Sequence, residues 1–73
     1  MSCVTPEGRP TELGRKILNA LKQGRHSPEE IAKEAGLPLF RVRSGLRDMM
    51  AAGLAELQGE EYHLTEKGAN FLK

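Results

Sequence analysis

The residues best suited to binding chemistry in this 73-residue chain lie between positions 40 and 47. They are one aromatic residue, three arginines and one serine: Phe40, Arg41, Arg43, Ser44 and Arg47. A guanidinium group can donate paired N–H groups to a phosphate or to the O6 and N7 atoms of guanine, and a serine hydroxyl can make either contact more weakly. A phenyl ring can pack on the methyl group of thymine, but an exposed aromatic ring beside arginines is equally typical of a protein-binding hot spot.

A helix over about 38–52 would position these side chains. Pro38 suits the first position of a helix, and Gly53 suits its end. On a helical projection Arg41 lies on a separate flank, while the other four candidates share one side. The opposite side carries the residues that we expect in the core: Leu39, Val42, Leu46, Met49, Met50 and Gly53.

A second helix and a tight turn precede this one. Ser27 can cap the second helix, Pro28 can take its first position, and Glu30 completes a capping box, so the helix runs to Ala35. Gly36 follows where the chain must turn with positive φ. The small and apolar residues over 31–46 have the spacing of a helix-turn-helix, in which two short helices cross closely: Ile31, Ala32, Ala35, Gly36, Leu37, Val42 and Leu46.

A first helix should run from a Thr11 cap to about Gln23, with Gly24 ending it. Its apolar stripe is roughly 160° wide, which predicts burial on more than one side. Arg25 and His26 then form a short extended link that we expect to pair with a later hairpin.

The apolar period changes from helical to alternating after Gly53. The alternation and a turn at Gly59 predict a β-hairpin. Thr65 can cap a last helix over 66–73. The chain thus divides into a flexible tail over 1–10, which lacks apolar periodicity, and one domain over 11–73.

Several short motifs together suggest a family. They are Ser27-Pro28-Glu29-Glu30-Ile31-Ala32, Gly36-Leu37, Val42, Leu46, Ala52-Gly53-Leu54 and Tyr62-His63-Leu64-Thr65-Glu66-Lys67-Gly68. With three helices, a hairpin and a closing helix, the chain resembles small winged helix-turn-helix regulators of the MarR and ArsR type. The resemblance implies an α+β, mostly α, fold with a three-helix core, a two-stranded β-hairpin wing and a short C-terminal helix.

The resemblance also implies a DNA-binding transcriptional regulator whose third helix lies in the major groove of double-stranded DNA. Carried over by position, the groove-facing residues would be Phe40, Arg41, Arg43, Ser44 and Arg47. The tip of the hairpin would touch the DNA backbone or the minor groove.

Further contacts depend on charge and on assembly. Arg15, Lys16 and Arg25 are possible phosphate contacts near the first helix, although ordinary solubility explains them as well. A homodimer through the first helix, at Leu18 beside Gly14, and through Phe71 near the C-terminus would place two third helices about one duplex turn apart.

The hairpin tip departs from the family pattern. Its residues, Gln58-Gly59-Glu60-Glu61, are acidic, and phosphates would repel them. An alternative function therefore stays open, in which the Phe40 face and the acidic hairpin bind a protein partner without DNA.

The composition favours a small binding domain over other classes. The net charge is only +1, and Cys3 is the single cysteine, so no internal disulfide can form. We recognise no catalytic set, no phosphate-binding glycine loop and no cluster of metal ligands, so we expect no enzyme, no metal and no cofactor. The apolar runs are too short to span a bilayer, and we expect a cytoplasmic protein.

Overall fold

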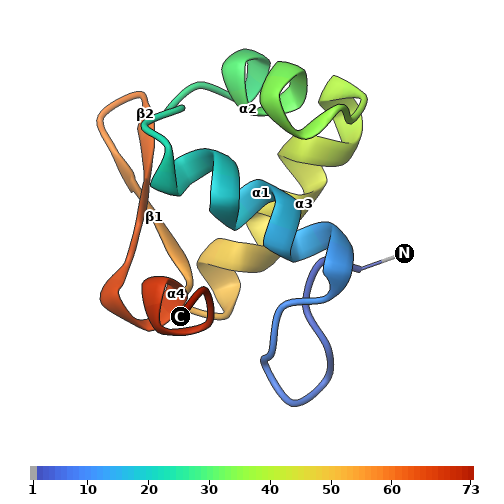
Figure 1. Ribbon diagram of the computed structural model, residues 1–73, viewed down its shortest axis with the longest axis vertical. Helices are drawn as coiled ribbons and strands as arrows, with labels where there is room; N and C mark the ends of the chain where they lie inside the picture. Colours follow the sequence, from blue (N-terminus) through green and yellow to red (C-terminus); the bar gives the residue numbers. More distant parts are fainter. Residues whose placement is uncertain (1) are drawn as a thin grey trace.

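The computed structural model describes residues 2–73 and contains four helices and one hairpin in these residues (Figure 1). In chain order the elements are α1 (Glu12–Lys22), α2 (Pro28–Ala35), α3 (Leu39–Ala51), β1 (Ala55–Gln58), β2 (Glu61–Leu64) and α4 (Glu66–Asn70). This order confirms the predicted architecture of three helices, a two-stranded antiparallel hairpin and a short closing helix.

Side-chain caps fix the starts of three helices. The hydroxyl oxygens of Thr11, Ser27 and Thr65 accept hydrogen bonds from backbone N–H groups three residues later, at 3.2, 3.1 and 3.0 Å. At α2 the carboxylate of Glu30 in return accepts from the backbone N–H of His26 and from the hydroxyl and the backbone N–H of Ser27, which lowers the pKa of Glu30. The predicted caps are therefore confirmed.

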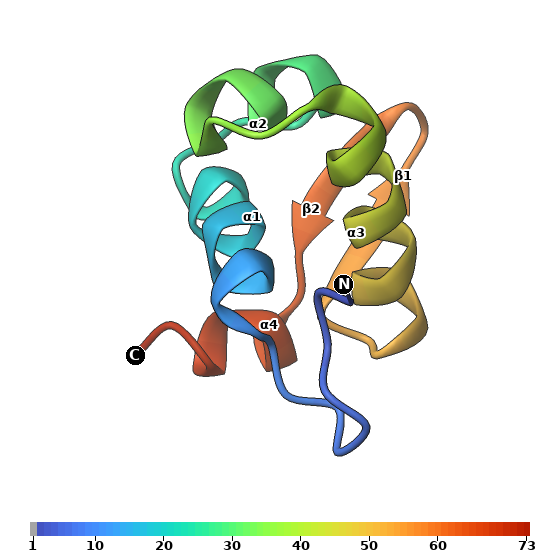
Figure 2. The same cartoon turned by 90° about the vertical axis from the view of Figure 1, so that its right-hand side faces the viewer.

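The turn between α2 and α3 depends on Gly36. Its φ of 68° lies in the left-handed region that glycine adopts without steric cost, and the next residue, Leu37, donates its N–H to the carbonyl of Ala32 at 3.0 Å. Pro38 then precedes the first residue of α3. Figure 2 shows α2 lying across the ends of α1 and α3, so the predicted helix-turn-helix is confirmed.

The core lies between the three long helices and the start of the hairpin. α1 supplies Ile17, Leu18, Ala20 and Leu21, all buried, which confirms its broad apolar stripe. The remaining buried apolar residues come from α2, α3, the start of the hairpin and the N-terminal segment: Ile31, Val42, Leu46, Met49, Leu54, Ala55 and Cys3. α3 is therefore held by one face only, and its other face is left to solvent.

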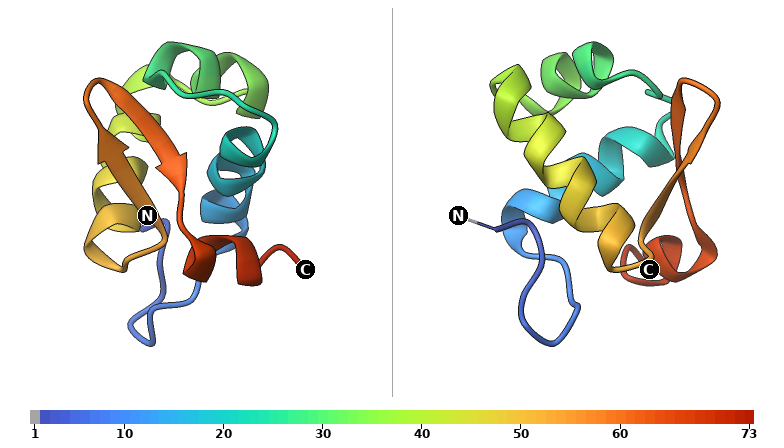
Figure 3. Two further views of the ribbon diagram at one scale, coloured as in Figure 1. Left: turned by 90° about the vertical axis from the view of Figure 1, so that its left-hand side faces the viewer. Right: turned by 180° about the vertical axis from the view of Figure 1, so that it is seen from behind.

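The hairpin is held to the helices through the link before α2. Its strands pair from Ala55 with Leu64 to Gln58 with Glu61, around a tight turn at Gly59. The backbone carbonyl of His26 accepts from the N–H of Tyr62, and Nδ1 of His26 lies 2.9 Å from the Tyr62 carbonyl oxygen. The expected pairing of the link with the hairpin is thus present, and Figure 3 shows the two segments side by side.

The last helix is shorter than the sequence predicts. α4 ends at Asn70 instead of continuing to Lys73. The N–H groups of Phe71 and Leu72 bond to carbonyls only three residues back, at Gly68 and Ala69, which tightens the chain and ends the α-helical pattern. Apolar periodicity alone did not reveal this tighter ending.

The sequence predicts a flexible tail over 1–10, but Cys3, Val4 and Pro10 pack against the rest of the domain, and Met1 lies outside the described residues. Cys3 is only 1% exposed, and its carbonyl accepts the N–H of Thr11 at 3.0 Å. Two helical glycines make room for it: a Cβ at Gly45 would lie 2.6 Å from the Cys3 sulfur, and one at Gly14 would collide with the Cys3 carbonyl. We call residues 2–10 the N-terminal segment. Its Cys3 packs between α1 and α3, whereas Pro6, Glu7 and Arg9 are exposed.

The thiol of Cys3 should be protected in the folded protein. Burial, and secondarily the negative charge of Asp48, raise the pKa of Cys3, so less thiolate is present at a given pH. We expect a chromogenic disulfide reagent to react at neutral pH about tenfold or more slowly with the native protein than with the urea-unfolded protein. Equal rates in the two states would contradict the packing of the N-terminal segment.

Of residues 2–73, none belongs to a helix that is both long and apolar enough to cross a membrane.

Candidate nucleic-acid interface

The exposed face of α3 gathers four of the five residues that the sequence singled out. Phe40 is 70% exposed, the side chain of Arg43 is 59% exposed, and Ser44 and Arg47 are also exposed. The face opposite them is buried and consists of Val42, Gly45, Leu46 and Met49. The predicted division of α3 into an inner and an outer face is therefore present.

Arg41 lies on the flank of this face and turns toward the aromatic ring. Its guanidinium carbon is 5.7 Å from the centroid of the Phe40 ring, within cation–π range. Arg41 is partly buried, unlike Arg43 and Arg47. It therefore joins the candidate surface through Phe40, an arrangement that helical spacing alone did not indicate.

An ion pair links the exposed face to the start of α2. The Nη2 atom of Arg43 lies 3.7 Å from a carboxylate oxygen of Glu29, whose side chain is 65% exposed. Asp48, the residue after Arg47, contacts the N-terminal segment. Its carboxylate accepts hydrogen bonds from the Ser2 hydroxyl and the Cys3 N–H, at 3.3 and 3.4 Å.

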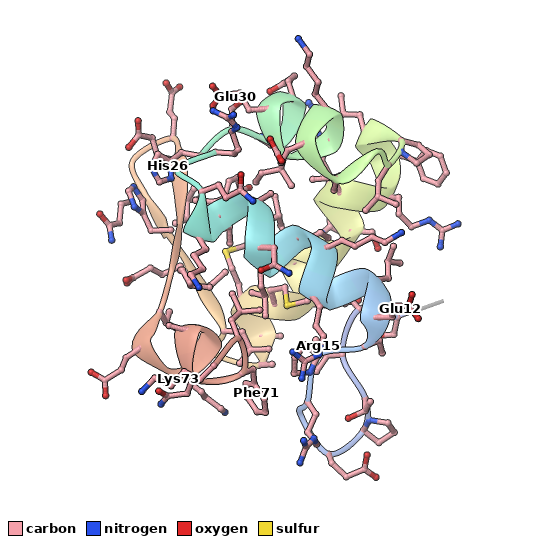
Figure 4. The ribbon with its side chains drawn as sticks, viewed as in Figure 1. Glu12, Arg15, His26, Glu30, Phe71 and Lys73 are labelled. Carbon is pink, nitrogen blue, oxygen red and sulfur yellow. The ribbon has the colours of Figure 1, made fainter. Side chains whose placement is uncertain are left out.

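The three possible phosphate contacts are dispersed. Arg15 donates to the backbone carbonyl of Phe71 at 2.7 Å, and Figure 4 shows these two residues near the end of the molecule opposite His26 and Glu30. Arg25 pairs with Glu34 at 3.2 Å. Lys16 is exposed on α1. Arg15 and Arg25 thus already have partners within the protein, and both would have to exchange or share them to bind phosphate.

The tip of the hairpin presents acidic groups, as the sequence indicates. Glu60 and Glu61 are exposed, and Glu61 lies 3.1 Å from Nε2 of His63. The ring of His63 stacks on that of His26, with centroids 4.1 Å apart. Leu57 is also 50% exposed on β1. The hairpin therefore offers an acidic tip and one apolar side chain rather than a cationic arm.

Part of the predicted homodimer interface is already covered by contacts within one chain. Leu18 is completely buried, and Gly14 is covered by the N-terminal segment, so neither can meet a second copy. Phe71 is partly buried, with the guanidinium of Arg9 at 5.8 Å from its ring centroid. The sequence placed Leu18 and Gly14 on an outer seam because the apolar stripe of the first helix is broad, but contacts within the chain cover both residues.

Comparison with known proteins agrees with the geometry. The model of the family described as winged helix-turn-helix matches residues 10–73. Searches of curated proteins and of solved structures returned no match. The family match covers all six elements, including the hairpin and the closing helix. The chain therefore belongs to the winged helix-turn-helix family.

Proposed function

We propose that this protein is a DNA-binding transcriptional regulator that reads the major groove of double-stranded DNA with α3. The observation that carries the proposal is the single exposed face of α3, where Phe40, Arg43, Ser44 and Arg47 project from a helix anchored in the core. Domains of this family generally bind DNA, and the major groove admits one α-helix. Binding rather than catalysis is the proposed activity.

The residues on this face suit different parts of a duplex. Arg43 and Arg47 lie one helical turn apart, so they could contact neighbouring guanines or phosphates. Phe40, beside Arg43, suits a thymine methyl group, and Arg41 on the flank suits a phosphate. The acidic hairpin tip is expected to stay clear of the DNA backbone.

A single copy of the protein is expected to bind DNA weakly, which favours binding as a dimer. A monomer with about three to five phosphate contacts would bind weakly at physiological salt. We therefore propose a homodimer through the exposed parts of α1 and the C-terminal segment, which would place two α3 helices about one duplex turn apart. MarR- and ArsR-type regulators are the proposed relatives, and the cytoplasm is the proposed location.

A titration of the isotope-labelled protein with mixed-sequence duplex DNA tests the proposal. Backbone amide shifts should change over residues 40–47 more than elsewhere, and the apparent affinity should fall steeply as salt rises. A salt-independent response, or shifts confined to the hairpin, would contradict groove reading by α3.

A second candidate function rests on two apolar side chains. Phe40 and Leu57 are the large hydrophobic residues exposed in the described part of the chain, and such residues are common at protein interfaces. In this case the Phe40 face and the acidic hairpin would bind a protein. The same titration separates the two functions, because a flat response up to high duplex concentration would favour the protein partner.

A further inference from the structure

We infer that Glu29 competes with DNA for Arg43 and so limits the affinity of the α3 face. This inference rests on the proposed function and names a residue that regulates the same site. Its basis is the ion pair between the start of α2 and the middle of α3, in which Nη2 of Arg43 and a carboxylate oxygen of Glu29 are 3.7 Å apart. A carboxylate is the side-chain group closest in chemistry to a phosphate as a ligand for arginine.

The cap of α2 places Glu29 where it can do this. Pro28 takes the first helical position, Glu29 the second and Glu30 the third. Glu30 is used by the capping box with Ser27, whereas the carboxylate of Glu29 reaches across to α3. The start of a helix also stabilises a negative side chain, so a carboxylate at this position is favourable without Arg43.

The exposure of both partners makes the pair exchangeable. The side chains of Glu29 and Arg43 are 65% and 59% exposed, so water and ions reach them and the pair is weak. A phosphate or a guanine that takes Arg43 must displace Glu29. The cost of that displacement should reduce duplex affinity by a small factor, about two- to fivefold, because exposed pairs of this kind have small free energies.

The test is a double-mutant cycle with Glu29→Gln, Arg43→Gln and the double variant. Binding of a fluorescently labelled mixed-sequence duplex is followed by anisotropy at low salt and at physiological salt. Glu29→Gln should tighten binding about two- to fivefold at low salt, and less at higher salt. In the Arg43→Gln background the same change should have little effect, because the contested arginine is gone.

Glu12→Gln is the matched control. It removes one exposed negative charge from the first turn of a helix, as Glu29→Gln does, but that helix is α1 rather than α2. It should tighten binding less than Glu29→Gln does. In the free protein, the Nε–H resonance of Arg43 should shift in Glu29→Gln and stay in place in Glu12→Gln.

Three results would overturn the inference. Equal tightening by Glu29→Gln with and without Arg43 would mean that Glu29 simply repels phosphates. Unchanged binding of Glu29→Gln, while the wild-type protein binds duplex in a salt-dependent manner, would remove Glu29 from the site but keep the proposed function. The absence of salt-dependent binding in every variant, including wild type, would overturn the proposed function itself.

Discussion

Replacing Arg43 and Arg47 together with glutamine is expected to weaken duplex binding by about 100-fold or more at low salt. Each arginine on the exposed face of α3 can contribute about 1–3 kcal/mol through contacts to guanine or phosphate. Each lost phosphate contact should also reduce the slope of log affinity against log salt by about 0.9. Anisotropy titrations at several salt concentrations measure both quantities.

The control for this prediction removes the same net charge elsewhere. Lys22, in the last turn of α1, and Lys73 are both exposed, and replacing both with glutamine should weaken binding far less. If the two double variants lose affinity equally, binding depends on total charge and not on the face of α3. Circular dichroism should confirm that both variants keep the native helix content.

Replacing Gly68 with alanine is expected to lower the free energy of unfolding by about 3 kcal/mol. Gly68 is buried in α4, and a Cβ there would collide with the backbone carbonyl of Leu54, at the entry to β1. A backbone atom cannot move aside as the end of a flexible side chain can, so the helix or the hairpin must shift. Helix propensity alone predicts the opposite, a gain of about 1 kcal/mol.

Urea unfolding shows whether Gly68→Ala lowers or raises the free energy of unfolding. The midpoint should fall for Gly68→Ala, and a midpoint that stays constant or rises would contradict the close approach of α4 to Leu54. Asn70→Ala is the control, because Asn70 is exposed in the same helix and its replacement should change stability by no more than about 0.5 kcal/mol.

Features set by neighbouring residues could be predicted from the sequence. The caps at Thr11, Ser27 and Thr65, the left-handed turn at Gly36 and the two faces of α3 each depend on a few adjacent positions. The structure contains each of them at the expected place. The sequence also marked Gly68 as the last residue of the motif that runs from Tyr62. It did not reveal the close contact between Gly68 and the Leu54 carbonyl, which leaves no room for a Cβ.

Features set by contacts between distant segments could not be predicted in this way. Cys3 is buried because Gly14 and Gly45, on two different helices, both lack a side chain. Each glycine, considered alone, is only expected to destabilise its helix. Only their juxtaposition shows that the N-terminal segment has a place to pack.

The same distinction between local features and long-range contacts applies to the candidate site. Exposure of Phe40, Arg43 and Arg47 follows from the helical period, so the sequence was sufficient for it. Their partners depend on how the helices cross: Arg43 meets Glu29 of α2, and Arg15 meets the carbonyl of Phe71. Charge patterns along the chain carry no information about such pairs.

The packing of the N-terminal segment has a consequence for the order in which the chain folds. Cys3 and Asp48 are in contact although they are 45 positions apart in the sequence, and such contacts form only after a long loop has closed. The caps of α1 and α2, in contrast, are local and can form early. The space that holds Cys3 exists only after α1 and α3 have met. The N-terminal segment should therefore dock last, onto helices that are already assembled.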